Sequence, residues 1–219
     1  MSQTILFLLL KATLETLYMV AAASIIATLV GLPLGVLLYI TRKGNIEEHP
    51  GLHRALAALV NMTRSIPFII LMIAVIPFTR LIMGTSIGTN AAIVPLSLAA
   101  MPFIARIVEN ALLEIQHGLI EAALAMGASS GQIIKKVLIP EAFPSIINGL
   151  TLTVVSLVGY SAMAGAVGGG GLGDLAIRYG YQRFDPGVML VTIVIMIILV
   201  QALQWSGDRL VKRFMHARN

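Results

Sequence analysis

The 219-residue sequence contains no cysteine, which excludes disulfide bonds, thiolate metal sites and cysteine nucleophiles. Charged residues are also scarce, at 11% of the chain, whereas a soluble domain carries about 25%. Hydrophobic residues make up 58% and the mean hydropathy is +0.92. This composition indicates that lipid, rather than water, surrounds most of the chain.

Aromatic residues are few, at 6%, and the apolar runs are continuous instead of alternating with polar residues. A transmembrane β-barrel needs a polar residue at every second position of its strands, so this pattern does not fit one. Helices of about 20 apolar residues are long enough to cross a bilayer, and such runs recur along the chain. The sequence therefore predicts an all-α, polytopic membrane protein.

Five transmembrane helices are expected, within a single membrane domain that covers residues 1–219. They span about 14–40, 57–78, 91–113, 146–167 and 188–203. The small residues Ala21 to Ala23 imitate the cleavage region of a signal peptide, but the apolar run continues through Ile40, so we expect a retained helix. An odd number of spans places the two termini on opposite sides of the membrane.

The basic residues flank the apolar runs and are unevenly distributed between the two sides. One side holds Arg42, Lys43, Arg54, Lys135, Lys136, Arg209, Lys212, Arg213 and Arg218, and the other only Lys11, Arg80, Arg178 and Arg183. The positive-inside rule then predicts an external N-terminus and a cytoplasmic C-terminus. A net charge of +5 would also suit nucleic acid, but its distribution favours membrane lipid as the partner and no nucleic acid.

The segment at about 115–141, between the third and fourth spans, is predicted to form two short helices with a hinge. Residues 121–126 are strong helix formers, and Gly127 can adopt the positive φ that ends a helix. Ser129 and Gln132 have the spacing of a capping box that starts a second helix. Pro140 is expected to end that helix.

This segment exposes small and apolar side chains on the predicted cytoplasmic side. Ala122 and Ala123 would allow close approach of another surface, and apolar contact would come from Leu124, Met126, Ile133 and Ile134. Two interpretations remain open. The surface either binds a partner protein or lies on lipid headgroups, helped by Lys135 and Lys136.

The spacing of the segment resembles the signature loop in the permease subunits of bacterial binding-protein-dependent ABC importers. Glu-Ala-Ala is followed by three residues, a glycine, nine residues and an apolar-x-apolar-Pro ending, with Val137 and Ile139 where isoleucine and leucine are usual. The resemblance implies a type I importer permease fold whose coupling helices sit in a cleft of a separate ATPase. The coupling residues it implies are Glu121, Ala122, Ala123, Leu124, Met126, Gly127 and Pro140.

No energy source or catalytic site is predicted within the chain. Gly127 and Gly131 lack the spacing and the lysine of a phosphate-binding loop, so ATP is expected on another subunit and no cofactor on this one. Gly168, Gly170 and Gly173 match a dinucleotide motif, but they follow a membrane helix instead of a strand, so we expect a flexible or tightly packed loop. The histidines are scattered, at 49, 53, 117 and 216, and predict no metal site. An enzyme is therefore not expected.

The fourth span holds the densest set of polar and polarisable side chains in any span. As a group they suit a translocation path for a small zwitterion, although each could instead bond to a neighbouring helix. The predicted path residues are Asn148, Thr151, Ser156, Tyr160, Ser161 and Met163. Before Pro67, the second span carries Asn61, Thr63, Arg64 and Ser65, and Arg64 is interpreted as an anchor to headgroups or to another subunit.

The outer segment at 164–184 is polar and aromatic enough to bind a protein. The predicted docking residues are Asp174, Arg178, Tyr181 and Arg183. The same stretch, with its four consecutive glycines, is similar to the permeases of methionine importers, and the similarity extends over nearly the whole chain. It implies a homodimer, two copies of an ABC ATPase, an extracytoplasmic methionine-binding lipoprotein, and L-methionine, D-methionine or derivatives as cargo in the bacterial inner membrane.

Two alternatives remain at this point. The cargo could be another amino acid or an osmolyte, or the protein could be a membrane-embedded enzyme or scaffold. The absence of paired catalytic groups in the spans argues against the enzyme.

Overall fold

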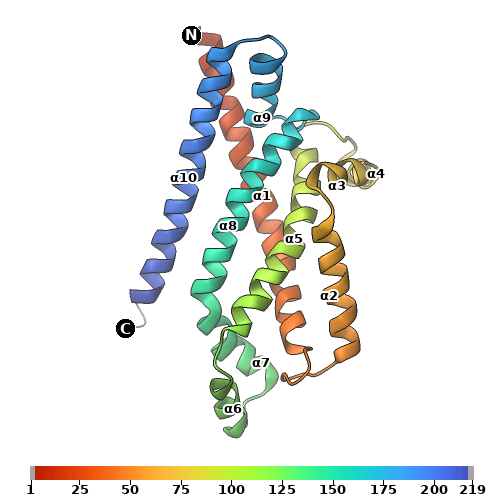
Figure 1. Ribbon diagram of the computed structural model, residues 1–219, viewed down its shortest axis with the longest axis vertical. Coiled ribbons are helices and arrows are strands. Elements are labelled where there is room, and N and C mark those ends of the chain that lie inside the picture. The colour runs from red at the N-terminus through yellow and green to blue at the C-terminus, as the bar shows by residue number, and fades with distance from the viewer. Residues whose placement is uncertain (1–2, 217–219) are drawn as a thin grey trace.

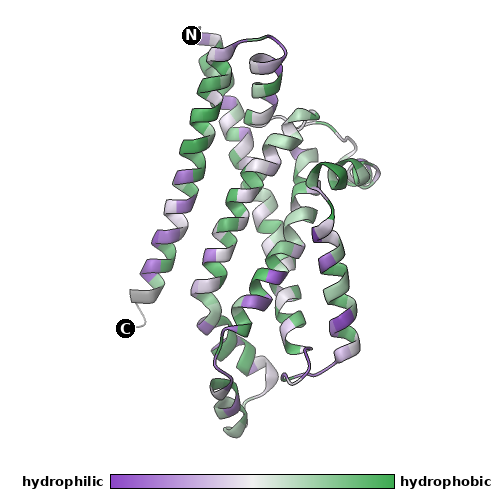
Figure 2. Ribbon diagram, in the orientation of Figure 1, coloured by the Kyte–Doolittle hydropathy of each residue, from purple (hydrophilic) through white to green (hydrophobic). Residues whose placement is uncertain are grey.

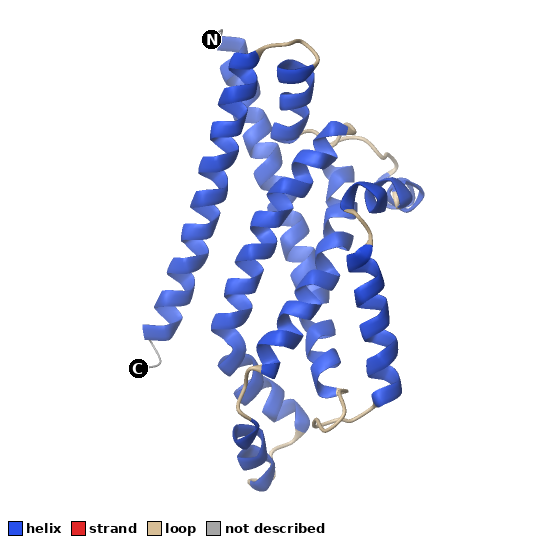
Figure 3. Ribbon diagram, viewed as in Figure 1, coloured by secondary structure: helices blue, strands red, loops and turns tan. Residues whose placement is uncertain are grey.

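The computed structural model describes residues 3–216, and every regular element among them is a helix (Figure 3). Four helices are long and apolar enough to cross a membrane: α1 (Gln3–Ile40), α5 (Thr89–Leu113), α8 (Ile139–Ala166) and α10 (Pro186–His216). They run along the long axis of the molecule, with α8 in contact with α1, α5 and α10 (Figure 1). The predicted all-α class is confirmed.

Two glycines allow α1 and α5 to approach closely. A Cβ atom at Gly35 would lie 2.5 Å from the carbonyl oxygen of Ala105, and one at Gly31 would lie 2.8 Å from Cβ of Ile104. Real Cβ atoms do not approach other atoms so closely, so only glycine fits at either position. The spacing of four residues between Gly31 and Gly35 therefore serves helix packing, as in other membrane helix pairs.

The second predicted span is not one straight helix. It consists of α2 (Pro50–Ser65), α3 (Phe68–Ala74) and α4 (Ile76–Met83), with a bend of 103° between α2 and α3. The residue before a proline avoids the helical region, and Ile66 before Pro67 is extended at φ −81° and ψ 124°. The prediction of a continuous helix at 57–78 is therefore wrong in its middle.

Most of the other helices extend beyond the predicted spans. The first begins at Gln3 rather than near residue 14, the fourth at Ile139 rather than near 146, and the last reaches His216 rather than 203. Hydropathy marks only the apolar middle of a helix, whereas backbone hydrogen bonding continues through its polar ends. Arg218, which contributed to the predicted orientation, lies outside the described residues.

The two ends of the bundle differ in character. One end carries the 41–49 connection, α6 (His117–Ala125) and α7 (Ser130–Ile133), and hydrophilic residues gather there and along the adjacent half of α10 (Figure 2). The N-terminal end carries the start of α1 and the short α9 (Gly171–Leu175) (Figure 1). The chain therefore starts at one end, and α10 runs toward the other.

The close packing of α1 on α5 predicts a stability loss for Gly35→Ala. The added methyl group has no space beside Ala105 and Val108, and overpacking of this kind costs about 1–3 kcal/mol. Thermal unfolding of the purified protein should show a lower Tm. Gly51→Ala is the control, because a Cβ atom at Gly51 meets nothing within 4 Å. Equal Tm values for the two variants would contradict this interpretation.

Candidate functional site

The coupling segment, residues 115–141, turns at Gly127. This residue has φ +76°, and its N–H donates to the carbonyl oxygen of Leu124 at 2.9 Å, while Ala128 N–H donates to Ala123 at 3.1 Å. The pair of bonds is a Schellman motif, which needs a left-handed residue at its centre. Next, Gln132 Oε1 accepts from the Ser129 N–H at 2.9 Å in a capping box. The predicted glycine turn and capping box are confirmed.

The prediction that Pro140 ends the second short helix is wrong. After α7 the chain forms a π-helical turn, η1 (Ile134–Leu138), in which Ile139 N–H donates to the carbonyl oxygen of Ile134, and it continues directly into α8. Proline has no N–H to donate, and it is tolerated in the first turn of a helix. The widened π turn lets the chain enter α8 at that point. As a result, α7, η1 and α8 form one continuous helical rod, Ser130–Ala166.

The exposed part of the coupling segment is smaller than expected. Met126 is 81% exposed and Leu124 48%, and Ala122 is exposed as well. In contrast, Ala123 and Ile133 are buried against the bundle, so the interpretation of these two as partner contacts is corrected. Backbone spacing alone could not separate the two faces, since both carry small or apolar residues. The outward apolar face is therefore centred on Leu124 and Met126.

Three cavities follow one another along the groove between α5 and α8. The first, of about 120 Å³, lies between Phe103 and Ile107 of α5 and Ser156 of α8. The second, of about 210 Å³, lies at the α2–α3 break beside Phe103 and Tyr160. The third, of about 120 Å³, lies nearer the N-terminal end, against Pro95 and Ala164. From the first cavity to the third, the residue numbers on α5 fall while those on α8 rise. The two helices run in opposite directions, so both place the three cavities in the same order along the groove.

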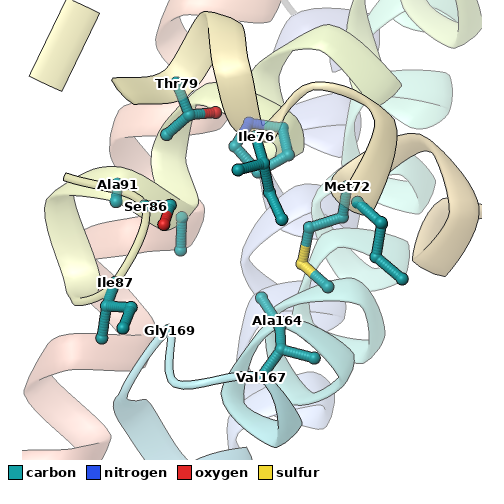
Figure 4. A pocket seen from close by; sticks show the side chains of 12 residues that line it. Met72, Ile76, Thr79, Ser86, Ile87, Ala91, Ala164, Val167 and Gly169 are labelled. Atoms are coloured by element: carbon teal, nitrogen blue, oxygen red, sulfur yellow. The ribbon is translucent and has the colours of Figure 1, made fainter. Parts of the chain in front are cut away.

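The third cavity has mainly apolar walls (Figure 4). Met72 and Ile76, from the broken α3–α4 region, face Ala164 and Val167 at the end of α8 (Figure 4). Thr79 and Ser86 are the hydroxyl-bearing residues among those that line it. The broken second span therefore forms one wall of both the second and the third cavity.

The structure brings some of the predicted path residues to this groove. Ser156 and Tyr160 line it, and the Tyr160 ring stacks on Phe68 with centroids 4.7 Å apart. Asn148 and Met163 are exposed on α8 but line none of these three cavities.

Thr151 and Ser161 lie elsewhere on α8. Thr151 packs beside Gly207 of α10. A Cβ atom added at Gly207 would lie 2.1 Å from the hydroxyl oxygen of Thr151. Ser161 is 2% exposed, and its hydroxyl donates to the carbonyl oxygen of Val158 at 2.7 Å. Thr151 also donates to a carbonyl of its own helix, that of Ile147 at 2.8 Å, so neither hydroxyl bonds to a neighbouring helix as the alternative expected. Neither residue lines the groove cavities, and their prediction as path residues is corrected.

Arg64 is an exposed residue of α2 that lies beside the middle of α5 rather than at a span end. Its guanidinium is 4.9 Å from the ring centroid of Phe103, which precedes the end of α5 at Leu113 by ten residues, or about 15 Å of helix rise. This position does not fit a headgroup anchor at a span end, and the side chain lines the second cavity. The interpretation as an anchor to another subunit stays a prediction, because Arg64 is exposed on the single chain. The proline break after Ser65 was the sequence signal for a site here.

The glycine-rich stretch after α8 is tightly packed. Gly171 has φ +75°, and its N–H donates to Oε2 of Glu15 at 2.9 Å, while Leu172 N–H donates to the Thr16 hydroxyl at 2.9 Å. A Cβ atom at Gly165 would lie 2.3 Å from the backbone nitrogen of Asp174. Of the two expected possibilities, a flexible or a tightly packed loop, the structure shows the packed one.

The predicted docking residues lie at the N-terminal end, opposite the coupling segment. They belong to α9 and to the π-helical turn η2 (Ala176–Tyr181) that follows it, or come just after it. Arg178 forms an ion pair with Asp174, and the Arg183 guanidinium lies 4.4 Å from the ring centroid of Tyr179. Tyr181 is 66% exposed. The ion pair and the stacked arginine hold this surface in shape.

The model of one protein family matches residues 31–216, and its description is the binding-protein-dependent transport system inner membrane component. The chain belongs to this family. Among curated relatives, the probable D-methionine transport system permease protein MetI of Vibrio cholerae is 58% identical over 95% of this chain and 93% of its own. The D-methionine transport system permease protein MetI of Escherichia coli K12 is 56% identical over 75% of this chain and 76% of its own.

Solved structures agree with this membership. A chain from the inward-facing MetNI methionine ABC transporter has a TM-score of 0.96 at 53% identity and covers 98% of this chain and 99% of its own. A chain from an amino acid ABC transporter with histidines has a TM-score of 0.74 at 18% identity, covers 94% of each chain, and supports the fold alone. The predicted importer permease fold is confirmed, and so is the inner-membrane transport family.

One buried ionic pair in this family member was missed at the sequence level. Glu109 of α5 is only 2% exposed, and its Oε2 accepts from Arg106, whose other terminal nitrogen donates to Asn61 Oδ1 of α2 at 2.6 Å. The bond from Arg106 to Asn61 joins α5 to α2 on the N-terminal side of the α2–α3 break. The three-residue spacing of Arg106 and Glu109 within an apolar run was the available signal.

Removal of Arg106 should destabilise the permease. Arg106→Ala leaves the Glu109 carboxylate buried and unpaired, which costs about 3–5 kcal/mol. The double variant Arg106→Ala/Glu109→Gln removes the buried charge as well and should recover part of the loss. Thermal unfolding of the three proteins measures this. If the double variant is no more stable than Arg106→Ala, the buried charge is not the cause.

Proposed function

We propose that the chain is the membrane-spanning permease of an ATP-binding-cassette importer for methionine, working as a homodimer with two copies of a separate ATPase. The observation that carries this proposal is the near-complete match to a methionine transporter chain, at a TM-score of 0.96 and 53% identity. The Vibrio cholerae relative, whose name includes D-methionine, covers 95% of the chain at 58% identity. The N-terminus is then external and the C-terminus cytoplasmic, as the basic residues favour.

The ATPase drives the permease through the coupling segment. Leu124 and Met126 provide an exposed apolar face for the ATPase surface, beside the Gly127 turn. Since α7, η1 and α8 form one helical rod of 37 residues, movement of the segment reaches the groove directly. Closure of two ATPase subunits on ATP would tilt these rods and alternate access to the path.

A second copy of the chain completes the path. Within one chain the groove along α5 and α8 is open on one side, and Leu152 and Met163 of α8 expose 55% and 48% of their surface. A second copy would cover such apolar faces and enclose the cargo. The outer surface with Asp174, Arg178, Tyr181 and Arg183 would receive the methionine-binding lipoprotein. In this assignment the chain holds no cofactor, and ATP stays on the ATPase.

Transport tests the proposal directly. Proteoliposomes with the permease, its ATPase and a methionine-binding protein should accumulate labelled methionine only when ATP is supplied, and excess unlabelled methionine should compete. A polar amino acid such as glutamate and an osmolyte such as glycine betaine should not compete. ATP-dependent uptake of glutamate or betaine in place of methionine would refute the assignment of the cargo.

Gly127→Val should uncouple the permease from its ATPase. The left-handed conformation costs an L-residue roughly 1–2 kcal/mol and is worse for a β-branched one, so the turn would reorient although no neighbour lies within 4 Å. We expect loss of ATPase copurification and of uptake. Gly118→Ala, in α6 and equally free of neighbours, is the control. Normal ATP-driven uptake by Gly127→Val would argue against the coupling role.

A further inference from the structure

The α2–α3 break places charged, hydroxyl and aromatic groups around one cavity. Its walls are formed by Thr63, Arg64, Phe68, Phe103 and Tyr160, and its volume is about 210 Å³. The Thr63 and Ser65 hydroxyls each donate to a carbonyl of their own helix at 2.9 Å, so their oxygens keep lone pairs for another donor. In membrane transporters, interrupted helices at mid-depth commonly line substrate sites.

Arg64 is the charged residue of this cavity, and it has no acidic partner among the described residues. The ion pairs formed by Lys11, Arg106, His117 and Arg178 all have other acidic partners and do not include it. The Arg64 guanidinium instead lies over the Phe103 ring, at 4.9 Å from its centroid. Arg64 is exposed on the single chain, at the mouth of this cavity. Within a membrane, a cation without a protein partner is costly unless an anion or water compensates it, so the cavity is suited to an anionic group.

We propose that this cavity is a transient binding subsite for the amino-acid cargo, with Arg64 holding the α-carboxylate. The inference rests on the proposed function and names the contact that the cargo makes inside the membrane. Guanidinium and carboxylate match as paired donors and acceptors. The stacked rings of Phe68 and Tyr160 supply a wall for the side chain. A thioether sulfur packs favourably against such rings.

The position of the cavity within the groove favours cargo over lipid as the source of the carboxylate. The cavity lies between the Ser156 cavity and the Pro95–Ala164 cavity, which puts it in the middle of the series. A lipid phosphate would have to leave the headgroup layer to reach the level of Phe103. One guanidinium and aromatic walls form a weak site, which a transporter needs in order to release its cargo.

Direct binding tests the subsite without the binding protein. The permease–ATPase complex, purified in nanodiscs of neutral phosphatidylcholine, is dialysed against labelled methionine. We expect the complex to retain labelled methionine and excess unlabelled methionine to abolish this retention. Methioninol, which has an alcohol in place of the carboxylate, should not abolish it. Competition by methioninol equal to that by methionine would overturn the proposal without any variant. Competition by vesicles of phosphatidylglycerol instead of methionine would show a lipid site and also overturn it.

Variants of α2 make the test specific. Arg64→Gln should weaken methionine binding by about tenfold or more, as expected for the loss of a hydrogen bond to a charged group. Arg64→Lys keeps the charge but loses the paired geometry of the guanidinium. Its affinity for methionine should therefore lie between those of the wild type and Arg64→Gln. Arg54→Gln is the control, because Arg54 is an exposed arginine on the same helix that lines none of the three cavities. Arg64→Gln that binds like Arg54→Gln would exclude the subsite.

Uptake by the same complex after reconstitution into proteoliposomes separates the two proposals. If wild-type proteoliposomes transport methionine but the complex alone retains none, the subsite is refuted and the proposed function stands. If wild-type proteoliposomes do not transport methionine in the presence of ATP, ATPase and binding protein, the proposed function fails first.

Discussion

The need to satisfy every backbone N–H and C=O group away from water governs this structure. In lipid the regular α-helix meets this need by itself, so a departure from it must be sheltered by protein or line a cavity. The departures here are the extended Ile66 before Pro67, the π turn at Ile134–Leu138 and the glycine turn after α8. They fall at the groove, at the coupling segment and at the outer surface. Irregular backbone therefore coincides with the segments for which a function besides spanning the membrane is proposed.

Features set by a few neighbouring residues could be predicted from the sequence. The turn at Gly127 and the capping box of Ser129 and Gln132 depend on local geometry and were predicted correctly. Features set by tertiary context could not. Pro140 was read as a helix end, because the π turn that carries the chain into α8 has no sequence signature of its own. Likewise, hydropathy merged α2 to α4 into one span, although Pro67 and Pro77 both signal a break.

The candidate site divides in a similar way. Ser156 and Tyr160 were found because polar residues in an apolar span are conspicuous, yet the same reasoning included Thr151 and Ser161, which face α10 and the core. On a helix, the direction of a side chain depends on its neighbours, and these are unknown before the fold. The position of Arg64 beside the second cavity was not predicted for the same reason, since it follows from where α2 meets Phe103. Glu109 was overlooked because a single carboxylate beside apolar residues resembles a span end.

The glycine turn between α8 and α9 leaves this part of the chain almost no freedom to vary. A methyl group at Gly165 would overlap backbone atoms of α9, and one at Gly173 would overlap backbone atoms of Ala162 in α8. At Gly171 a methyl group would collide with Thr16. Backbone atoms cannot be exchanged for smaller ones, so no second substitution can compensate for the first. Over evolutionary time this end of the bundle can then change only through the side chains that project from it, while the scaffold beneath them stays fixed.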